Sequence, residues 1–293
     1  MRLPRGRIGS DDTHRLLGYG MASSLADGAL IRDGDTLAVG GGRGVYHMCE
    51  AQREARYLRA RNIMIVSLCG DIYPHHELGP SNFRLDADTN VNLLGSAFEE
   101  KVDLRMVSHP IGTADPELPK KKSQYFFGKD WDQRTPNHAF AGVGVVTGIH
   151  RLAVLAGKQN HHVMSVELHA RLETLGTLCQ RYSRNIGELE PYFPVAEVAH
   201  NLFFVPDRTG RTTISKSDRS EFEDLITAIN ENLFSPSLAD LGRMEALILI
   251  AGTALKAGAI RHLLTAIKSD GSNIYPLRFI CTDHETAELV LKH

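Results

Sequence analysis

Short apolar segments that end in glycine, each followed by a helical pattern, recur along this chain. The clearest is EALILIAG (245–252), which precedes an apolar helical pattern at 253–267. Apolar strands that alternate with helices are typical of a parallel sheet buried on both faces, because the crossover helices cover both faces. The chain is therefore predicted to adopt an α/β fold.

Weaker copies of the same alternation extend this prediction over most of the chain. Further strands are expected within 33–42, 62–70, 103–110, 138–146, 201–206 and 277–283. Further helices are expected at 13–30, 44–58, 85–100, 160–183, 218–233 and 284–293. We expect a flexible leader at 1–12 and then one domain over 13–293, a three-layer, Rossmann-like, mostly parallel sheet with helices on both faces. The segment at about 150–240 is expected to form a helical subdomain inserted between strands.

Charge and cysteine content restrict the class of function. The formal net charge of the 293 residues is −2, so no overall field attracts nucleic acid or an anionic membrane surface. The four cysteines are too sparse for a disulfide framework, which favours a reducing cytoplasm. No apolar run reaches the length of about 18 residues that a membrane span needs. We expect a cytoplasmic protein with no membrane partner and no DNA-binding domain in this chain.

Two glycine-rich turns are predicted to bind an anion, because ligands of open parallel sheets bind outside the carboxyl ends of the strands. The turn AGTALK (251–256) supplies Gly252, Thr253 and Lys256, and the helix after it is expected to begin at about Thr253. The first amides of a helix are unpaired and carry positive potential, which suits a phosphate. The turn GGGRG (40–44) adds an arginine that can bind a phosphate or carboxylate through two N–H groups.

Other turns at the same edge extend the candidate ligand site. The predicted ligand-binding residues are Gly41, Gly42, Arg43, Gly44, Gly70, Asp71, Gly142, Gly144, Gly252, Thr253, Lys256 and Asp283. Asp283 either accepts hydrogen bonds from sugar hydroxyls or caps the last helix, and the two roles are compatible.

The sequence lacks the motifs of nucleotide binding, dinucleotide binding and metal binding. The phosphate-binding loop of nucleotide hydrolases is absent, and the dinucleotide fingerprint requires a glycine where Val45 stands. The fourteen histidines lack metal-ligand spacing, so no metal site is predicted. No cofactor and no catalytic nucleophile is expected.

The order of these turns resembles the sugar-binding effector domain of SorC/DeoR-type transcriptional regulators. The most specific part is the closing pair AGTALKAGAI (251–260) and CTDHETAELVL (281–291), and IVSLCGD (65–71), VSHPIG (107–112) and AGVGVV (141–146) add weaker matches. The resemblance implies the fold of ribose-phosphate isomerase and glucosamine-phosphate deaminase. It also implies a sugar or sugar-phosphate effector that is bound without catalysis, a homo-oligomer (dimer or tetramer), and DNA contact only through a region absent from this chain.

Two alternatives remain open at this point. A sugar-phosphate isomerase of the same fold needs a carboxylate base and an electrophile beside the sugar. The candidate bases are Asp283, Glu285, Asp86 and Asp88, and the candidate electrophiles are His75, His76 and Lys256. The other alternative is an oligomerisation scaffold whose turns bind nothing.

Overall fold

A computed structural model describes most of the chain. The described residues are 10–26, 30–55, 58–69, 86–107, 117, 121–122, 124–125, 136–146, 166–184, 191–208, 210–266 and 274–292. Most of the predicted leader lies outside these residues.

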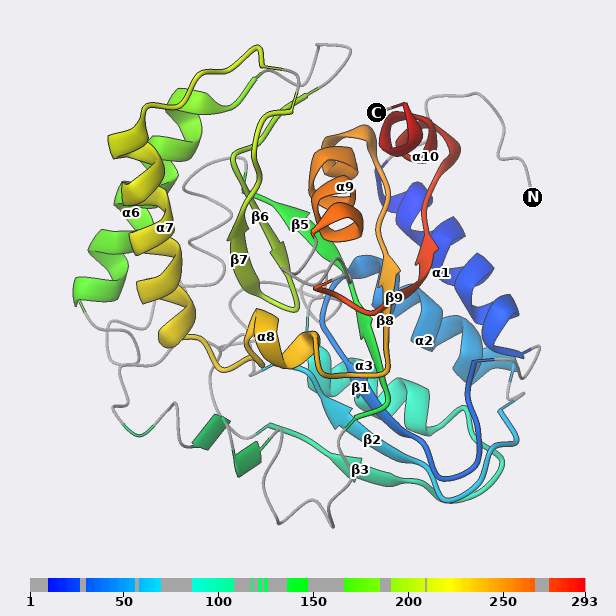
Figure 1. Ribbon diagram of the computed structural model, residues 1–293. Helices are drawn as coiled ribbons and strands as arrows, with labels where there is room; N and C mark the ends of the chain where they lie inside the picture. Colours follow the sequence, from blue (N-terminus) through cyan, green and yellow to red (C-terminus); the bar gives the residue numbers. More distant parts are fainter. Residues whose placement is uncertain are drawn as a thin grey trace.

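A six-stranded parallel sheet forms the centre of the fold, in the order β3-β2-β1-β4-β8-β9 (Figure 1). Its strands are β1 (Thr36–Val39), β2 (Met64–Ser67), β3 (Asp103–Arg105), β4 (His138–Ala141), β8 (Ala246–Ile250) and β9 (Leu277–Cys281). The chain builds outward from β1 through β2 to β3, then returns to the other side of β1 with β4. This reversal puts a crevice outside the carboxyl ends of β1 and β4, where ligands of such sheets bind.

Helices cover both faces, as the alternation predicted. One face carries α1 (Ser10–Ala26), α2 (Arg43–Ala55) and α3 (Ala87–Gly95), and the other carries α9 (Ala257–Thr265), with α10 (His284–Leu291) packed against α9. In β8 the side chains alternate between the two cores: Ile248 packs with the α1–α2 side and Leu249 with the α9 side. The predicted α/β class, with a mostly parallel sheet and helices on both faces, is confirmed.

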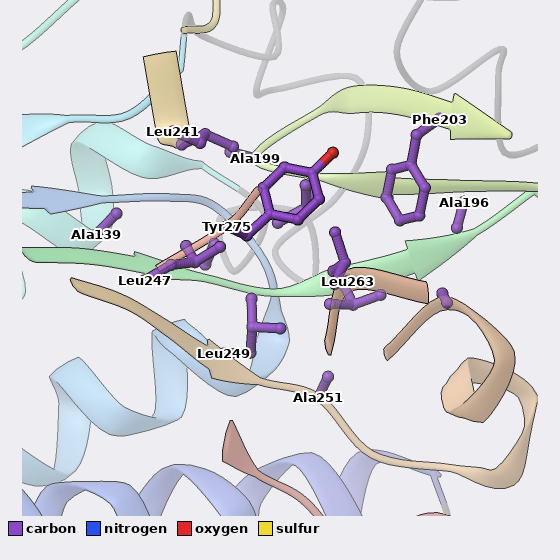
Figure 2. Close-up of a cluster of buried hydrophobic side chains, with 14 of the residues drawn as sticks. Ala139, Ala196, Ala199, Phe203, Leu241, Leu247, Leu249, Ala251, Leu263 and Tyr275 are labelled. Atoms are coloured by element: carbon purple, nitrogen blue, oxygen red, sulfur yellow. The ribbon is translucent and has the colours of Figure 1, made fainter. Parts of the chain in front are cut away.

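Figure 2 shows the core on the α9 side of the sheet. Leu249 of β8 lies beside Leu263 of α9, Leu247 of β8 belongs to the same cluster, and Phe203 comes in from a second, smaller sheet. All four side chains are at most 4% exposed. This shared core fixes the smaller sheet against the larger one.

The smaller sheet corrects one predicted strand. Residues 138–146 were expected to form a single strand, but β4 ends at Ala141 and β5 (Val143–Val145) belongs to a different, antiparallel sheet. Gly142 separates the two strands, and it lies against the carbonyl oxygen of Gly41 at the edge of the main sheet. An apolar run of nine residues reads the same whether it stays in one sheet or passes into a second one.

The inserted segment contains strands as well as helices. Its helices are α6 (Val166–Tyr182), α7 (Lys216–Glu231) and the short α8 (Leu238–Leu241). They accompany the antiparallel hairpin of β6 (Val195–Val198) and β7 (Asn201–Phe204). The strand β7 was predicted, but β6 was missed because its sequence, VAEV, is short and its hairpin turn lacks the usual Asn-Gly signal.

No helix in the described part of the chain is long and apolar enough to cross a membrane.

The contact between α1 and α2 depends on Gly18. A Cβ atom at this position would lie 2.5 Å from Cβ of His47 and 2.6 Å from the backbone nitrogen of Met48. We predict that Gly18→Ala lowers the free energy of unfolding by about 1–3 kcal/mol, because it forces the two helices apart. Urea denaturation measures this change.

The matched control is Gly20→Ala in the same helix. The Cβ atom added there would meet only the sulfur of Cys281, at 4.0 Å. Alanine is the better helix former, so this variant should gain about 0.5–1 kcal/mol. Equal effects of the two substitutions would contradict the close approach of α1 and α2.

Candidate functional site

A cleft of about 330 Å³ opens at the carboxyl ends of the central strands. This volume falls in the range of small-molecule sites, roughly 300–1,000 Å³. Its walls come from the turns after β1, β4 and β8, from α1, and from the β6–β7 hairpin. The predicted residues that line it are Gly41, Gly42, Arg43, Gly44, Gly142, Gly144, Thr253 and Lys256. The structure therefore brings three separately predicted turns into one cleft.

The turn after β1 aims the start of α2 at the cleft. Gly42 has φ +114°, a conformation that glycine adopts readily, and α2 begins at the next residue, Arg43. A Cβ atom on Gly44 would lie 2.8 Å from Cγ2 of Ile250, so only glycine lets α2 lie this close to the end of β8. The first amides of α2 and the Arg43 guanidinium thus border the same space. Arg43 lies 3.8 Å from a carboxylate oxygen of Asp11 in α1.

The turn after β8 differs from the prediction. The helix was expected to begin at Thr253, but Thr253 has φ +85°, and a single 3₁₀ turn, η4 (Ala254–Lys256), precedes α9. A threonine with positive φ cannot be the first residue of an α-helix, so α9 begins only at Ala257. Lys256 nevertheless lines the cleft, and its ammonium group donates to Nε2 of His14 over 3.2 Å.

Gly252 and Asp283 lie behind the cleft lining, where they hold the turn in shape. The backbone N–H of Thr253 donates to Oδ2 of Asp283 at 2.6 Å. Thr286 donates its backbone N–H to Oδ1 of Asp283 and its hydroxyl to Oδ2. The capping interpretation of Asp283 is therefore confirmed. A Cβ atom on Gly252 would lie 2.4 Å from Cδ1 of Leu17, so this glycine allows α1 to pack on the turn.

Two of the predicted residues, Gly70 and Asp71, lie outside the described residues. Three further polar residues that sequence reasoning missed also line the cleft: His14, Glu197 and His200. Glu197 and His200 belong to the hairpin whose first strand, β6, was not predicted. His14 precedes the turns in the sequence by more than twenty residues, and no local motif marks it.

Glu197 and His200 form a buried charged pair in the hairpin. Oε2 of Glu197 and Nδ1 of His200 are 3.9 Å apart, and their side chains are 6% and 11% exposed. Burial lowers the pKa of His200, but the sulfur of Cys69 and the Glu197 carboxylate outweigh this effect and raise the pKa from 6.5 to about 10. These contacts favour the protonated form of His200. The cleft is therefore lined by the positively charged side chains of Arg43 and Lys256 and by the Glu197–His200 pair of the hairpin.

Three of the four carboxylates that were candidate bases serve other roles. Asp86 caps α3 and accepts from Thr89, and Asp88 accepts from Ser67 and from the backbone of Val107. Neither is part of the cleft lining, nor is Asp283. Among the described residues, no group of three or more His, Cys, Asp or Glu side chains could hold a metal ion.

The fold is shared with solved structures, although no sequence-level relative is found. No protein-family model and no curated protein matches the sequence. Solved structures of transcriptional regulators do match over nearly the whole chain. One is a transcriptional regulator from Streptococcus pneumoniae TIGR4, with TM-score 0.63 and 14% identity, covering 100% of this chain and 90% of that chain.

Two further matches carry more specific descriptions. A putative sugar-binding domain of a transcriptional repressor from Vibrio fischeri gives TM-score 0.63 and 13% identity, covering 99% of this chain and 92% of that chain. The full-length sorbitol operon regulator SorC from Klebsiella pneumoniae gives TM-score 0.60 and 16% identity, covering 97% of this chain and 74% of that chain. The resemblance to SorC/DeoR-type regulators seen in the sequence is thereby confirmed at the level of the fold.

The backbone of Thr253 yields a stability prediction. Its φ of +85° is costly for a residue with a branched side chain. We predict that Thr253→Gly raises the free energy of unfolding by about 1 kcal/mol, because glycine relieves this cost while keeping the N–H bond to Asp283. Urea denaturation measures the gain. Thr227→Gly, on the exposed face of α7, is the control and should lose a few tenths of a kcal/mol.

The raised pKa of His200 predicts how stability depends on pH. A group whose pKa is higher in the folded state stabilises the protein fully below its unfolded pKa, near 6.5, and loses that contribution as the pH rises through about 10. The stability difference between wild type and His200→Asn should therefore be largest below about pH 6.5 and shrink as the pH rises through about 10. Asparagine tolerates the left-handed backbone at this position. A difference that stays constant over this range would contradict a charged His200.

Proposed function

We propose that this chain is a sugar-phosphate-binding effector domain of a transcriptional regulator and binds its ligand without transforming it. The observation that carries the proposal is the gathering of Arg43, Lys256 and the start of α2 around one cleft at the topological switch of the sheet. Each of these groups favours an anion. The two neighbours described as a sugar-binding domain and as a sorbitol operon regulator support the choice of a sugar.

The phosphate end of the ligand is assigned to the turns after β1 and β8. A phosphate there can accept from the guanidinium of Arg43 and the ammonium of Lys256. It also lies at the positive end of the α2 helix dipole. The glycines at 41, 42 and 44 keep side chains from blocking access to the amides.

The sugar end is assigned to the β5–β6 side of the cleft. Gly142 and Gly144 leave the backbone open beside the ligand, and Glu197 offers carboxylate oxygens to hydroxyl groups. A cleft with cations at one side and a carboxylate at the other suits a ligand with one phosphate and several hydroxyls. Gly70, Asp71, Gly252 and Asp283 remain predicted contacts or supports of this site.

The proposed role in regulation follows from differential binding. A ligand that contacts both sheets binds more tightly to one arrangement of them, and it shifts the population of a homo-oligomer by that difference in affinity. DNA contact is assigned to a region beyond this chain. The four cysteines are free thiols in the structure, which favours a cytoplasmic location.

An isomerase remains the second candidate, and one observation favours it. Glu197 is a carboxylate beside an imidazolium in the cleft, which is the pairing of base and electrophile that aldose–ketose isomerisation needs. Exchange of deuterium from solvent into C2 of a bound sugar phosphate would establish this activity. Loss of the exchange in Glu197→Gln would identify the base.

The proposed phosphate contacts predict a loss of affinity. We expect Arg43→Ala and Lys256→Ala each to weaken binding of a sugar phosphate about tenfold or more, because each removes a charge-assisted hydrogen bond. Isothermal titration calorimetry with glucose 6-phosphate, ribose 5-phosphate and inorganic phosphate measures the change. Arg15→Ala, an exposed arginine of α1 outside the cleft lining, is the control. Wild-type protein that binds none of a wider panel of sugar phosphates at millimolar concentration would overturn the proposed function.

A further inference from the structure

The tip of the β6–β7 hairpin has an unusual backbone for its sequence. Val198 pairs with Asn201, so Ala199 and His200 are the only two residues of the turn. Their φ angles are +48° and +62°. A two-residue turn with positive φ at both positions strongly favours Asn-Gly, because a Cβ atom is disfavoured in the left-handed region. A histidine therefore occupies a position where glycine would adopt the same backbone conformation at a lower energetic cost.

The strained position coincides with the ligand cleft. His200 lines the cleft together with Glu197, its neighbour across the turn. The His200 side chain is fixed from two sides, by the Glu197 carboxylate and by the sulfur of Cys69 at the end of β2. Backbone strain of this kind persists where the surrounding structure holds it, and it occurs often at ligand sites.

The chemistry of the pair restricts what it can recognise. An imidazolium only donates hydrogen bonds and a carboxylate only accepts them. Two adjacent hydroxyls of a sugar can satisfy both, since one accepts from the imidazolium while the other donates to the carboxylate. A second phosphate is disfavoured here, because the Glu197 carboxylate would repel it.

We propose that His200 is a specificity-determining residue that, together with Glu197, reads a vicinal pair of hydroxyls on the sugar end of the ligand. This inference rests on the proposed function and narrows it to a sugar monophosphate with an intact diol. The phosphate binds near Arg43 and Lys256, and the diol binds at the hairpin. The strained turn then has a functional reason, because it places His200 in the cleft lining beside Glu197.

The test compares three kinds of probe on wild type and on His200→Gly, a substitution that the turn itself favours. The probes are inorganic phosphate, the sugar phosphate that wild type binds most tightly, and the single-deoxy analogues of that sugar phosphate. We expect His200→Gly to weaken binding of the sugar phosphate about tenfold or more and to leave binding of inorganic phosphate unchanged. One deoxy analogue should bind wild type as weakly as it binds His200→Gly, and this analogue identifies the hydroxyl that is read.

Two further variants keep the test decisive. In His200→Gly alone, the buried Glu197 carboxylate loses its charged partner, which can destabilise the fold. The double variant His200→Gly with Glu197→Gln also removes that carboxylate charge, so it replaces the single variant in the comparison if the single variant folds poorly. Asn62→Gly replaces another residue with positive φ, +55°, on an exposed loop outside the cleft lining, and should change neither affinity. Sugar-phosphate affinity that His200→Gly leaves unchanged, or that falls in parallel with phosphate affinity, overturns the inference alone. A wild type that binds no sugar phosphate overturns the proposed function and this inference with it.

Discussion

The parallel pairing of β1 with β4 is the constraint on which the rest of this structure depends. Because the chain returns to the far side of β1 after completing β3, two strand ends that are about 100 residues apart in the sequence become neighbours. The glycine turn at 40–44 and the break at Gly142 then face one another. The cleft is the space between them, closed by the turn after β8 and by the hairpin.

Most of the sheet could be predicted from the sequence, because a strand buried on both faces leaves an unbroken apolar run such as ALILI in β8. The prediction failed where burial does not reveal which sheet a strand joins, as at Gly142, and where a short strand contains a buried charge, as at Glu197 in β6. The predicted start of α9 was wrong for a different reason. Thr253 has a backbone that its residue type disfavours, and sequence preference cannot predict such a conformation.

The candidate site was predicted in its turns but not in its chemistry. Glycines mark strand-to-helix turns plainly, so the residues around Gly42 and Lys256 were found. His14 and His200 reach the cleft from α1 and from the hairpin tip, and only tertiary packing brings them there. Asp283 shows the opposite case: its role as a helix cap was readable from the sequence, whereas its bond to the amide of Thr253 was not.

Gly142 has a consequence for the mechanics of the molecule. The chain passes through this one residue from the parallel sheet directly into the antiparallel sheet, so the two sheets meet at a joint whose backbone has no side chain to restrict it. The core that Leu249 of β8 shares with Phe203 of β7 holds the two sheets together at this joint. Lys256 and Glu197 therefore line the cleft from the two sides of a joint that the core fixes, and a ligand in contact with both side chains bridges the two sheets.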